Sequence, residues 1–291
     1  MMPGGATFSP RRGALAAAAR WRLPFSRQAW RGLAGNWLGV GAGSSLDFQD
    51  HRAYVPGDDP RHIHWQAFAR TGALTMKLYR AEVAPFVDLA VDVSPSMALT
   101  PAKLARTDEL VAFCVECADR AGAPVRVQTV AGRALRSVSA DEVRAGRWRE
   151  RLPAVAVGDA VLPGPIPWRP GAMKVLISDL LYPGEPSSLL VTLAGGSGVG
   201  VVLAPTVAEE AELPWRGNVE LTDCESGVMR TQRIDEPLAS RYHAAYARHF
   251  ALWREASRRR GVLFAGVRAE GELVHALAGE AFAAGAVEAT A

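Results

Sequence analysis

From residue 86 onward, short apolar segments alternate with longer segments of helical character, and this alternation limits the fold more than any other feature. The apolar segments cover residues 86–91, 125–130, 173–178, 199–203 and 262–267, and helical segments separate them at 101–120, 141–152, 187–194, 237–260 and 272–284. Such alternation is typical of parallel strands joined by helices. We therefore predict an α/β domain over residues 86–284, with a mainly parallel sheet covered by helices on both faces.

The first 85 residues have a different charge balance. They carry 11 Lys and Arg against 5 Asp and Glu, whereas the remainder carries 22 against 25. Two interpretations stay open: contact with an acidic partner or lipid surface, and a solvated basic leader. The net charge of +3 is too small to indicate a nucleic-acid-binding protein.

Within this part, residues 1–11 are predicted to be a disordered leader and residues 12–85 a separate N-terminal segment. Residues 12–34 are expected to form one or two amphipathic helices, interrupted at Pro24. The glycine-rich residues 39–43 follow no clear strand, so a flexible turn is favoured over a phosphate-binding loop.

The expected cellular location depends on segments for membrane insertion or secretion, which the sequence lacks. Spanning a bilayer takes about 20 consecutive apolar residues, and no run of that length occurs. Residues 14–19 are too short for a secretory core. The three cysteines are few, as expected in a reducing compartment. We therefore expect a cytoplasmic protein.

Candidate cation ligands stand at the ends of two predicted strands. Asp92, Ser94 and Ser96 follow the first strand directly, and Asp179 follows the strand at residues 173–178. An acid and two hydroxyls spaced by one residue can converge on Mg²⁺ or Mn²⁺, which prefer oxygen ligands. The alternative is that Asp92 and Ser94 cap the helix that follows.

The run Asp92-Val-Ser-Pro-Ser96 resembles the first motif of the metal-ion-dependent adhesion site of von Willebrand factor A domains, and Asp179 resembles the third motif. The family's second motif is a threonine in the loop between them. Here the matching position holds Asp159, which could enter the cation's ligand shell, and the complete site departs from the family pattern.

A second resemblance lies upstream. The block that runs from Arg52-Ala-Tyr54 through Gly57-Asp58-Asp59-Pro-Arg61 to Trp65 and then Ala69-Arg70 resembles the bacterial family called domain of unknown function fifty-eight. The match extends over roughly residues 12–283. One departure is His64, where the family usually has aspartate.

This resemblance implies an A-like domain with an N-terminal decorated segment. It also implies a non-enzymatic adaptor in complex assembly or chaperoning, working with a MoxR-type AAA+ ATPase. The charged residues of the upstream block have two readings: a network fixing the segment to the A-like domain, which we favour, and a binding surface. They are Arg52, Asp58, Asp59, Arg61 and Arg70, accompanied by Tyr54 and Trp65.

Two other function classes remain as alternatives. A metal-dependent hydrolase would need a base near Ser94, and the sequence around Ser94 offers none. A peripheral membrane protein would use the Arg- and Trp-containing leader. Cys114 and Cys117 lie at helical spacing and are interpreted as core residues, because a structural zinc site needs about four ligands.

Overall fold

A six-stranded sheet organises the body of the protein, in a computed structural model that describes residues 10–27, 32–42, 48–152 and 163–290. The strand order is β12-β9-β8-β5-β6-β7, and only β7 runs antiparallel to its neighbour. The bounds are β5 Val87–Asp92, β6 Val125–Ala131, β7 Ala134–Val138, β8 Met173–Ile177, β9 Val199–Thr206 and β12 Leu263–Arg268. The predicted mainly parallel sheet is confirmed.

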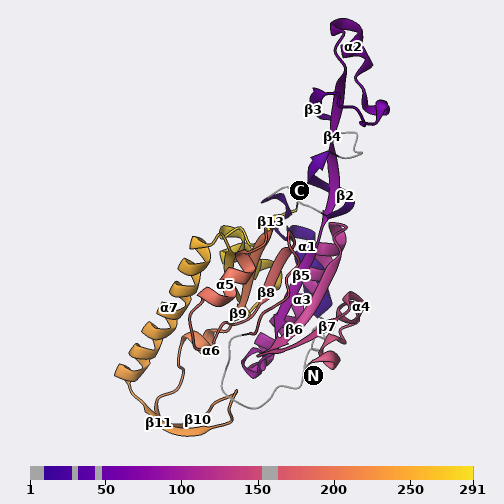
Figure 1. The fold of residues 1–291 in the computed structure, drawn as a ribbon. Helices are drawn as coiled ribbons and strands as arrows, with labels where there is room; N and C mark the ends of the chain where they lie inside the picture. Colours follow the sequence, from indigo (N-terminus) through magenta and orange to yellow (C-terminus); the bar gives the residue numbers. More distant parts are fainter. Residues whose placement is uncertain (1–9, 28–31, 43–47, 153–162, 291) are drawn as a thin grey trace.

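Helices cover both faces of this sheet (Figure 1). The core on one face contains residues of α1 (Pro10–Arg20), α3 (Pro101–Arg120) and α8 (Leu273–Ala276), the last continued by η5 (Leu277–Ala281). The core on the other face contains residues of α5 (Ser187–Ala194) and α7 (Glu236–Arg259). Successive strand residues serve opposite faces, so Leu89 and Val91 belong to the first core and Ala90 to the second.

The carboxyl ends of β5, β8 and β9 share one edge of the sheet. Here lie η3 (Pro95–Ala98) and α6 (Ala208–Ala211). The hairpin of β10 (Gly217–Thr222) and β11 (Met229–Ile234) extends from this end of the body (Figure 1). In parallel α/β sheets, ligand sites form at this edge.

A three-stranded antiparallel arm extends from the opposite end (Figure 1). It consists of β2 (Gly32–Ala42), β4 (Thr75–Pro85) and β3 (Phe48–Ala53), in that order. The connection from β3 to β4 forms the tip, with η2 (Pro60–His62) and α2 (Trp65–Thr71). Phe86 alone separates β4 from β5, so the arm joins the sheet at the amino end of its central strands.

The predicted helix over residues 12–34 is wrong beyond Arg20. The chain becomes extended in β1 (Trp21–Arg22), which pairs with β13 (Glu288–Ala289), then forms η1 (Phe25–Arg27) and enters β2 at Gly32. Proline at position 24 disfavours helical geometry in Leu23, and the pairing of β1 with β13 ends the helix earlier, at Arg20. Trp30 lies outside the described residues.

Two further expectations need correction. The glycine-rich residues 39–42 belong to β2 and not to a turn, and register shifts against β4 mark bulges in this strand, where glycines are common. The expected helix over residues 141–152 is divided into α4 (Ala140–Arg144) and η4 (Trp148–Arg151), because Gly146 adopts a left-handed φ of 70°.

Among the described residues, no helix combines the length and apolar character needed to cross a membrane. Helix α1, at the start of the described chain, packs against the body of the protein. Ala14, Ala17 and Ala18 are buried, α1 packs against α3, and Trp21 Nε1 donates to the Val274 carbonyl oxygen at 2.9 Å. A free amphipathic anchor in this segment therefore has no support.

The packing of α1 leads to a stability prediction. Ala17 has no exposed surface, so Ala17→Leu should overpack the α1–α3 contact and lower the free energy of unfolding by about 1–3 kcal/mol. Ala16 is exposed on the same helix, so Ala16→Leu is the matched control and should change little. Denaturant unfolding measures both, and equal stabilities would contradict the packed position of α1.

Candidate functional site at the carboxyl edge

Asp92 is the buried centre of the carboxyl edge. Its Oδ1 accepts from the Ser94 backbone N–H at 2.9 Å, and its Oδ2 accepts from Ser178 Oγ at 2.7 Å. Burial raises the pKa of Asp92 to about 6, and the negative charge of Asp179 adds to this effect. Because β5 and β8 are neighbouring parallel strands, Asp92 and Asp179 lie at the same edge, as predicted.

A chain of hydroxyls supports the Asp92 carboxylate. Ser178 has one hydroxyl proton and gives it to Asp92, so the Tyr182 hydroxyl, 3.0 Å from Ser178 Oγ, must be the donor to Ser178. Tyr182 is buried, and burial raises the pKa of its phenol well above the usual value. While Asp92 is ionised, each hydroxyl proton of the chain is therefore directed toward it.

Lys103 provides a cation inside this edge. Its side chain has no exposed surface, and Nζ lies 2.6 Å from Asp179 Oδ2 and 2.5 Å from Glu210 Oε1. Burial acts to lower the pKa of Lys103, but the two carboxylates outweigh it and the pKa is raised. Burial raises the pKa of Glu210 more than the contact with Lys103 lowers it.

The backbone after Asp179 is strained. Leu180 is fully buried with φ of 61°, a left-handed conformation that is uncommon for a branched residue. Its N–H donates to Ser178 Oγ at 3.1 Å, and its carbonyl oxygen lies 2.9 Å from His249 Nε2 of α7. These contacts hold a conformation that is otherwise unfavourable, a feature found at functional sites.

The two predicted serine ligands are adjacent at the surface of the edge. Ser94 Oγ and Ser96 Oγ are 3.1 Å apart, and both residues are half-buried. The Ser96 backbone N–H donates to Glu225 Oε1 at 3.0 Å. Glu225 comes from the turn of the β10–β11 hairpin, so this hairpin places a carboxylate over the Ser94–Ser96 loop.

The donor set suits a cation with few protein ligands. Two oxygens in adjacent positions around Mg²⁺, each about 2.1 Å from the ion, lie about 3.0 Å apart, close to the Ser94–Ser96 separation of 3.1 Å. Asp179, in contrast, is already paired with Lys103. No group of three His, Cys, Asp or Glu side chains in the described part of the chain is arranged to hold a metal. Asp159 lies outside the described residues.

The charged residues of the upstream block lie in and beside the arm tip and pair locally. Arg52 donates two hydrogen bonds to Asp58, at 2.7 and 2.5 Å, and Arg61 forms an ion pair with Asp59 at 2.7 Å. Hydrogen bonds from Arg61 lower the pKa of Asp59 to about 2. These pairs fix the fold of the tip. They do not join it to the body, so the favoured network interpretation does not fit the structure.

The remaining residues of the block also lie at the tip. The Tyr54 N–H donates to the Leu74 carbonyl oxygen at 3.0 Å, which closes the loop, while Trp65 is exposed. The Arg70 guanidinium contacts the Gln66 carbonyl at 3.4 Å. The ring of His64 stacks on the ring of His51, and His64 Nδ1 lies 2.8 Å from His51 Nε2. A histidine pair therefore stands where the family's aspartate is expected.

Sequence reasoning missed the residues that complete the edge, namely Lys103, Glu210, Glu225 and Tyr182. Lys103 carried a readable signal. It is one of only three lysines in a chain with 33 basic residues, and it lies in the first turn of a helix, where the helix dipole disfavours cations. Glu210 and Glu225 lie in segments distant in sequence, and no local pattern places them beside Asp92.

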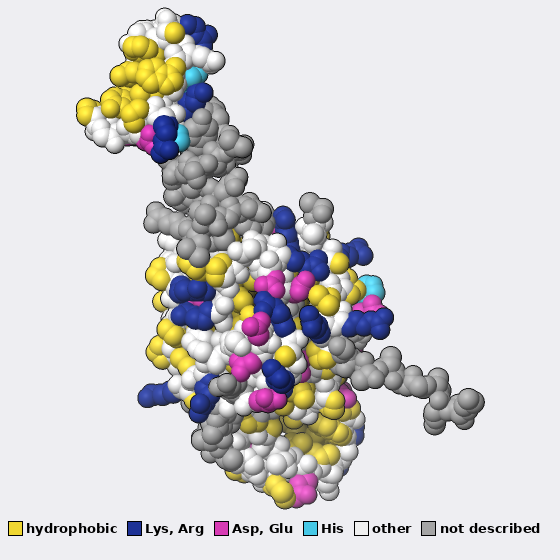
Figure 2. Space-filling model, turned by 90° about the vertical axis from the view of Figure 1, so that its right-hand side faces the viewer, with side chains coloured by type: hydrophobic (Ala, Val, Ile, Leu, Met, Phe, Trp, Pro, Cys, Tyr) yellow, Lys and Arg dark blue, Asp and Glu magenta, His cyan; other side chains and the backbone are white. Residues whose placement is uncertain are grey.

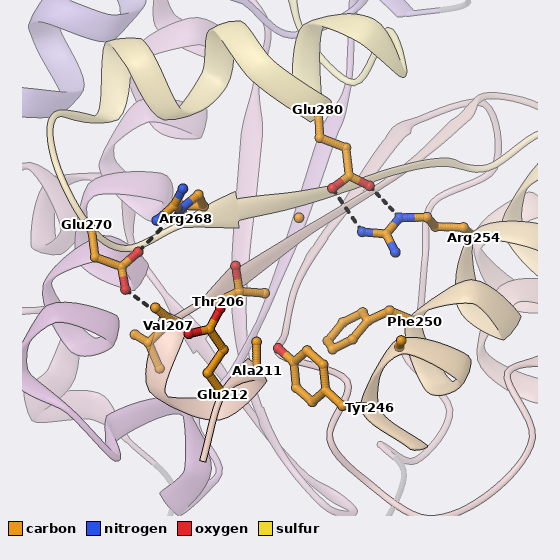
Figure 3. Close-up of a pocket in the computed structure, with 13 residues that line it drawn as sticks. Thr206, Val207, Ala211, Glu212, Tyr246, Phe250, Arg254, Arg268, Glu270 and Glu280 are labelled. Atoms are coloured by element: carbon orange, nitrogen blue, oxygen red, sulfur yellow. Dashed lines mark hydrogen bonds and ion pairs between the residues drawn. The ribbon is translucent and has the colours of Figure 1, made fainter. Parts of the chain in front are cut away.

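A separate pocket of about 450 Å³ lies between α6, α7 and β12. Figure 3 shows the rings of Tyr246 and Phe250 on one side and the Arg254–Glu280 ion pair, at 2.6 Å, on another. A Cβ on Gly266 would come within 2.9 Å of Glu280, so glycine keeps this wall open. The lining carries both signs of charge and indicates no ligand class.

The raised pKa of Asp92 gives a prediction on pH. The folded carboxyl keeps its proton up to about pH 6, whereas the ordinary value is 3.8. The wild type should therefore lose stability as pH rises through this window, by on the order of 3 kcal/mol. Asp92→Asn cannot ionise and should gain stability relative to the wild type toward neutral pH.

Urea unfolding at pH values from about 4 to about 8 measures this difference. The control is Asp141→Asn, since Asp141 is an exposed carboxyl with 90% of its side-chain surface accessible. Parallel pH profiles for the wild type and Asp92→Asn would show that the Asp92 carboxyl is not perturbed.

Removing the Lys103 ammonium should be costly. Lys103→Met keeps the side-chain length but leaves Asp179 and Glu210 buried without their cation, which should lower the free energy of unfolding by about 3–5 kcal/mol. Lys77→Met, at a half-buried position on β4, should stay within about 0.5 kcal/mol of the wild type. Calorimetry that found equal stabilities would exclude a buried ion pair at Lys103.

Comparison of the sequence with known proteins identifies a family. A model of the family described as Protein of unknown function DUF58 matches residues 50–131. This stretch runs from β3 to the end of β6 and contains the arm tip, Asp92 and Lys103. A solved structure, described as conserved hypothetical protein BatB from Bacteroides thetaiotaomicron, covers 69% of this chain and 98% of its own at 16% identity, with a TM-score of 0.39, too low to argue a shared fold.

Two curated relatives extend the match. An uncharacterized protein of Mycobacterium bovis is 31% identical over 235 residues, which is 75% of this chain and 73% of that protein. An uncharacterized protein of Mycobacterium tuberculosis strain H37Rv matches to the same extent. With a family-model match across the arm tip and the Asp92 loop, and relatives of this similarity along most of its length, the chain belongs to the family of proteins of unknown function DUF58.

Proposed function

We propose that this protein is a non-enzymatic protein-interaction adaptor whose partner-binding surface is the carboxyl edge of a von Willebrand factor A-like sheet. The observation that carries the proposal is the hydrogen bond from the Ser96 N–H to the Glu225 carboxylate. This backbone donor and the two hydroxyls beside it are suited to bind a carboxylate. A partner's aspartate or glutamate would use the same donor once the hairpin moved aside.

Exposed apolar side chains at this end of the body also support a protein partner. Leu99, which follows η3, is 52% exposed, and Trp215, just before β10, is 47% exposed. On the hairpin itself, Val228 and Met229 are 49% and 60% exposed. Apolar groups next to polar ones are typical of protein interfaces. The family resemblance supports a MoxR-type AAA+ ATPase as the partner, with complex assembly or chaperoning as the process.

A divalent cation would fit this proposal. Asp92, Ser94 and Ser96 are the residues that would hold Mg²⁺ or Mn²⁺, with water completing the shell. The ion would supply an open coordination position for the partner's carboxylate. Asp179 would contribute through its charge, because Lys103 already occupies one of its oxygens.

The hydrolase alternative finds less support in the described part of the chain. The Ser94 hydroxyl is hydrogen-bonded to Ser96, and neither serine has a hydrogen bond to a histidine or lysine there. Lys103, the nearby amine, is paired with two carboxylates and has a raised pKa, so it is a poor base.

Binding to a purified MoxR-type ATPase tests the adaptor proposal. Ser94→Ala with Ser96→Ala should weaken binding about tenfold or more, because it removes two neighbouring hydroxyls from the proposed carboxylate site. Glu225→Gln should strengthen binding, because it weakens the competing internal carboxylate. Isothermal titration calorimetry with and without Mg²⁺ measures both effects.

Arg258→Ala is the matched control, since Arg258 is exposed near the far end of α7. If the serine variant and this control bound the ATPase equally well, the partner surface would lie elsewhere. A Mg²⁺-induced rise in melting temperature that disappears in Asp92→Ala would support the cation. A melting temperature unchanged by Mg²⁺ would leave metal-independent binding by the loops.

A further inference from the structure

We propose that the tip of the arm is a membrane-contact site that binds the surface of anionic lipid bilayers. This proposal is independent of the adaptor proposal, because it concerns the opposite end of the molecule and different residues. It depends on four apolar side chains, on the charge balance around them, and on the position of the tip.

Four apolar side chains at the tip are exposed to solvent. Val55 is 56% exposed and Trp65 is 57% exposed, while Phe68 and Leu74 are each 38% exposed. Figure 2 shows hydrophobic side chains gathered on one side of the tip. Aqueous exposure of such a group is unfavourable unless another phase or partner covers it.

The tip has its own small core, and the exposed group does not belong to it. Ile63 and Met76 are buried and face each other across an isolated β-bridge. Trp65 and Phe68 lie one helical turn apart on α2, with ring centroids 6.1 Å apart in an edge-to-face arrangement. The fold of the tip is therefore complete while these two rings still face solvent.

Charge at the tip favours an anionic surface. Asp58 and Asp59 are paired with Arg52 and Arg61, so their negative charges are balanced. Arg70 and Lys77 form no ion pair within the described residues, and over residues 48–77 four Arg and Lys stand against three Asp, an excess of one positive charge. Cations near a bilayer containing anionic lipid are each worth about 1 kcal/mol.

Position and residue type favour a membrane over a protein partner. Tryptophan is suited to the bilayer interface because its ring is apolar and its N–H remains hydrated. The tip also projects beyond the body, so the body does not obstruct its approach to a flat surface (Figures 1 and 2).

Vesicle sedimentation of the full chain tests this proposal. Phosphatidylcholine vesicles containing phosphatidylglycerol should bind the wild type, and vesicles of phosphatidylcholine alone should bind it much less. Trp65→Ser with Phe68→Ser should lower partitioning at least about tenfold, because the inserted apolar surface is lost. The matched control is Trp215→Ser, whose tryptophan is 47% exposed on the body, and it should bind like the wild type.

A second pair of variants tests the charges without removing apolar groups. Arg70→Gln with Lys77→Gln should reduce partitioning by roughly fivefold per cation and weaken its salt dependence. Arg230→Gln with Arg233→Gln makes the same change in net charge on the exposed strand β11 and should have little effect. Absence of wild-type binding to anionic vesicles, or equal losses in the tip and control variants, would overturn the proposal and favour a protein occupant.

Discussion

The ammonium group of Lys103 is the contact on which the carboxyl edge depends. It comes from the first turn of α3 and joins Asp179, after β8, to Glu210 of α6. Three segments that are distant in the sequence are therefore fixed to each other by one side chain. Without this cation, Asp92, Asp179 and Glu210 would place three carboxylates near one another in a region of low dielectric constant, which is strongly unfavourable. The ion pair makes a dense group of carboxylates compatible with folding.

Lys103 balances only part of this charge. Asp92 is stabilised by hydrogen bonds from Ser178 and the Ser94 N–H, yet burial still raises its pKa to about 6. Glu225 adds another carboxylate above the Ser94–Ser96 loop. The edge thus retains an excess of negative charge near neutral pH, and a proton or a cation at Asp92 would relieve it. Because of this excess charge, we expect the stability of the edge to depend on pH and on divalent ions. Asp179 contributes less to the excess, because it is paired with Lys103.

The sequence predicted the body better than the arm for a physical reason. Buried parallel strands such as residues 199–203 contain only apolar residues and glycine, so their composition reveals them, and the shared direction of β5 and β8 places Asp92 and Asp179 at one edge. The arm offers no such signal, because the glycine-rich strand β2 is specified by pairing with β4. Lys103 and Glu225 were missed for another reason. Their partners are 76 and 129 residues away, so although the rarity of lysine singles out Lys103, no local pattern identifies either partner.

The two ends of the molecule are connected through a rigid junction. Phe86 is the single residue between β4 of the arm and β5 of the sheet, and the Arg169 guanidinium lies 4.5 Å from the centre of its ring. Beside it, the buried Asp88 carboxylate accepts hydrogen bonds from Arg126 and Arg169 at 2.7 Å each. A buried carboxylate with paired guanidinium groups resists displacement, because separating them would expose an unpaired charge. The body therefore holds the base of the arm firmly at the amino end of β5, while the Asp92 loop lies at the other end of the same strand. The two proposed surfaces therefore lie beyond opposite ends of β5, so binding at one would not block binding at the other.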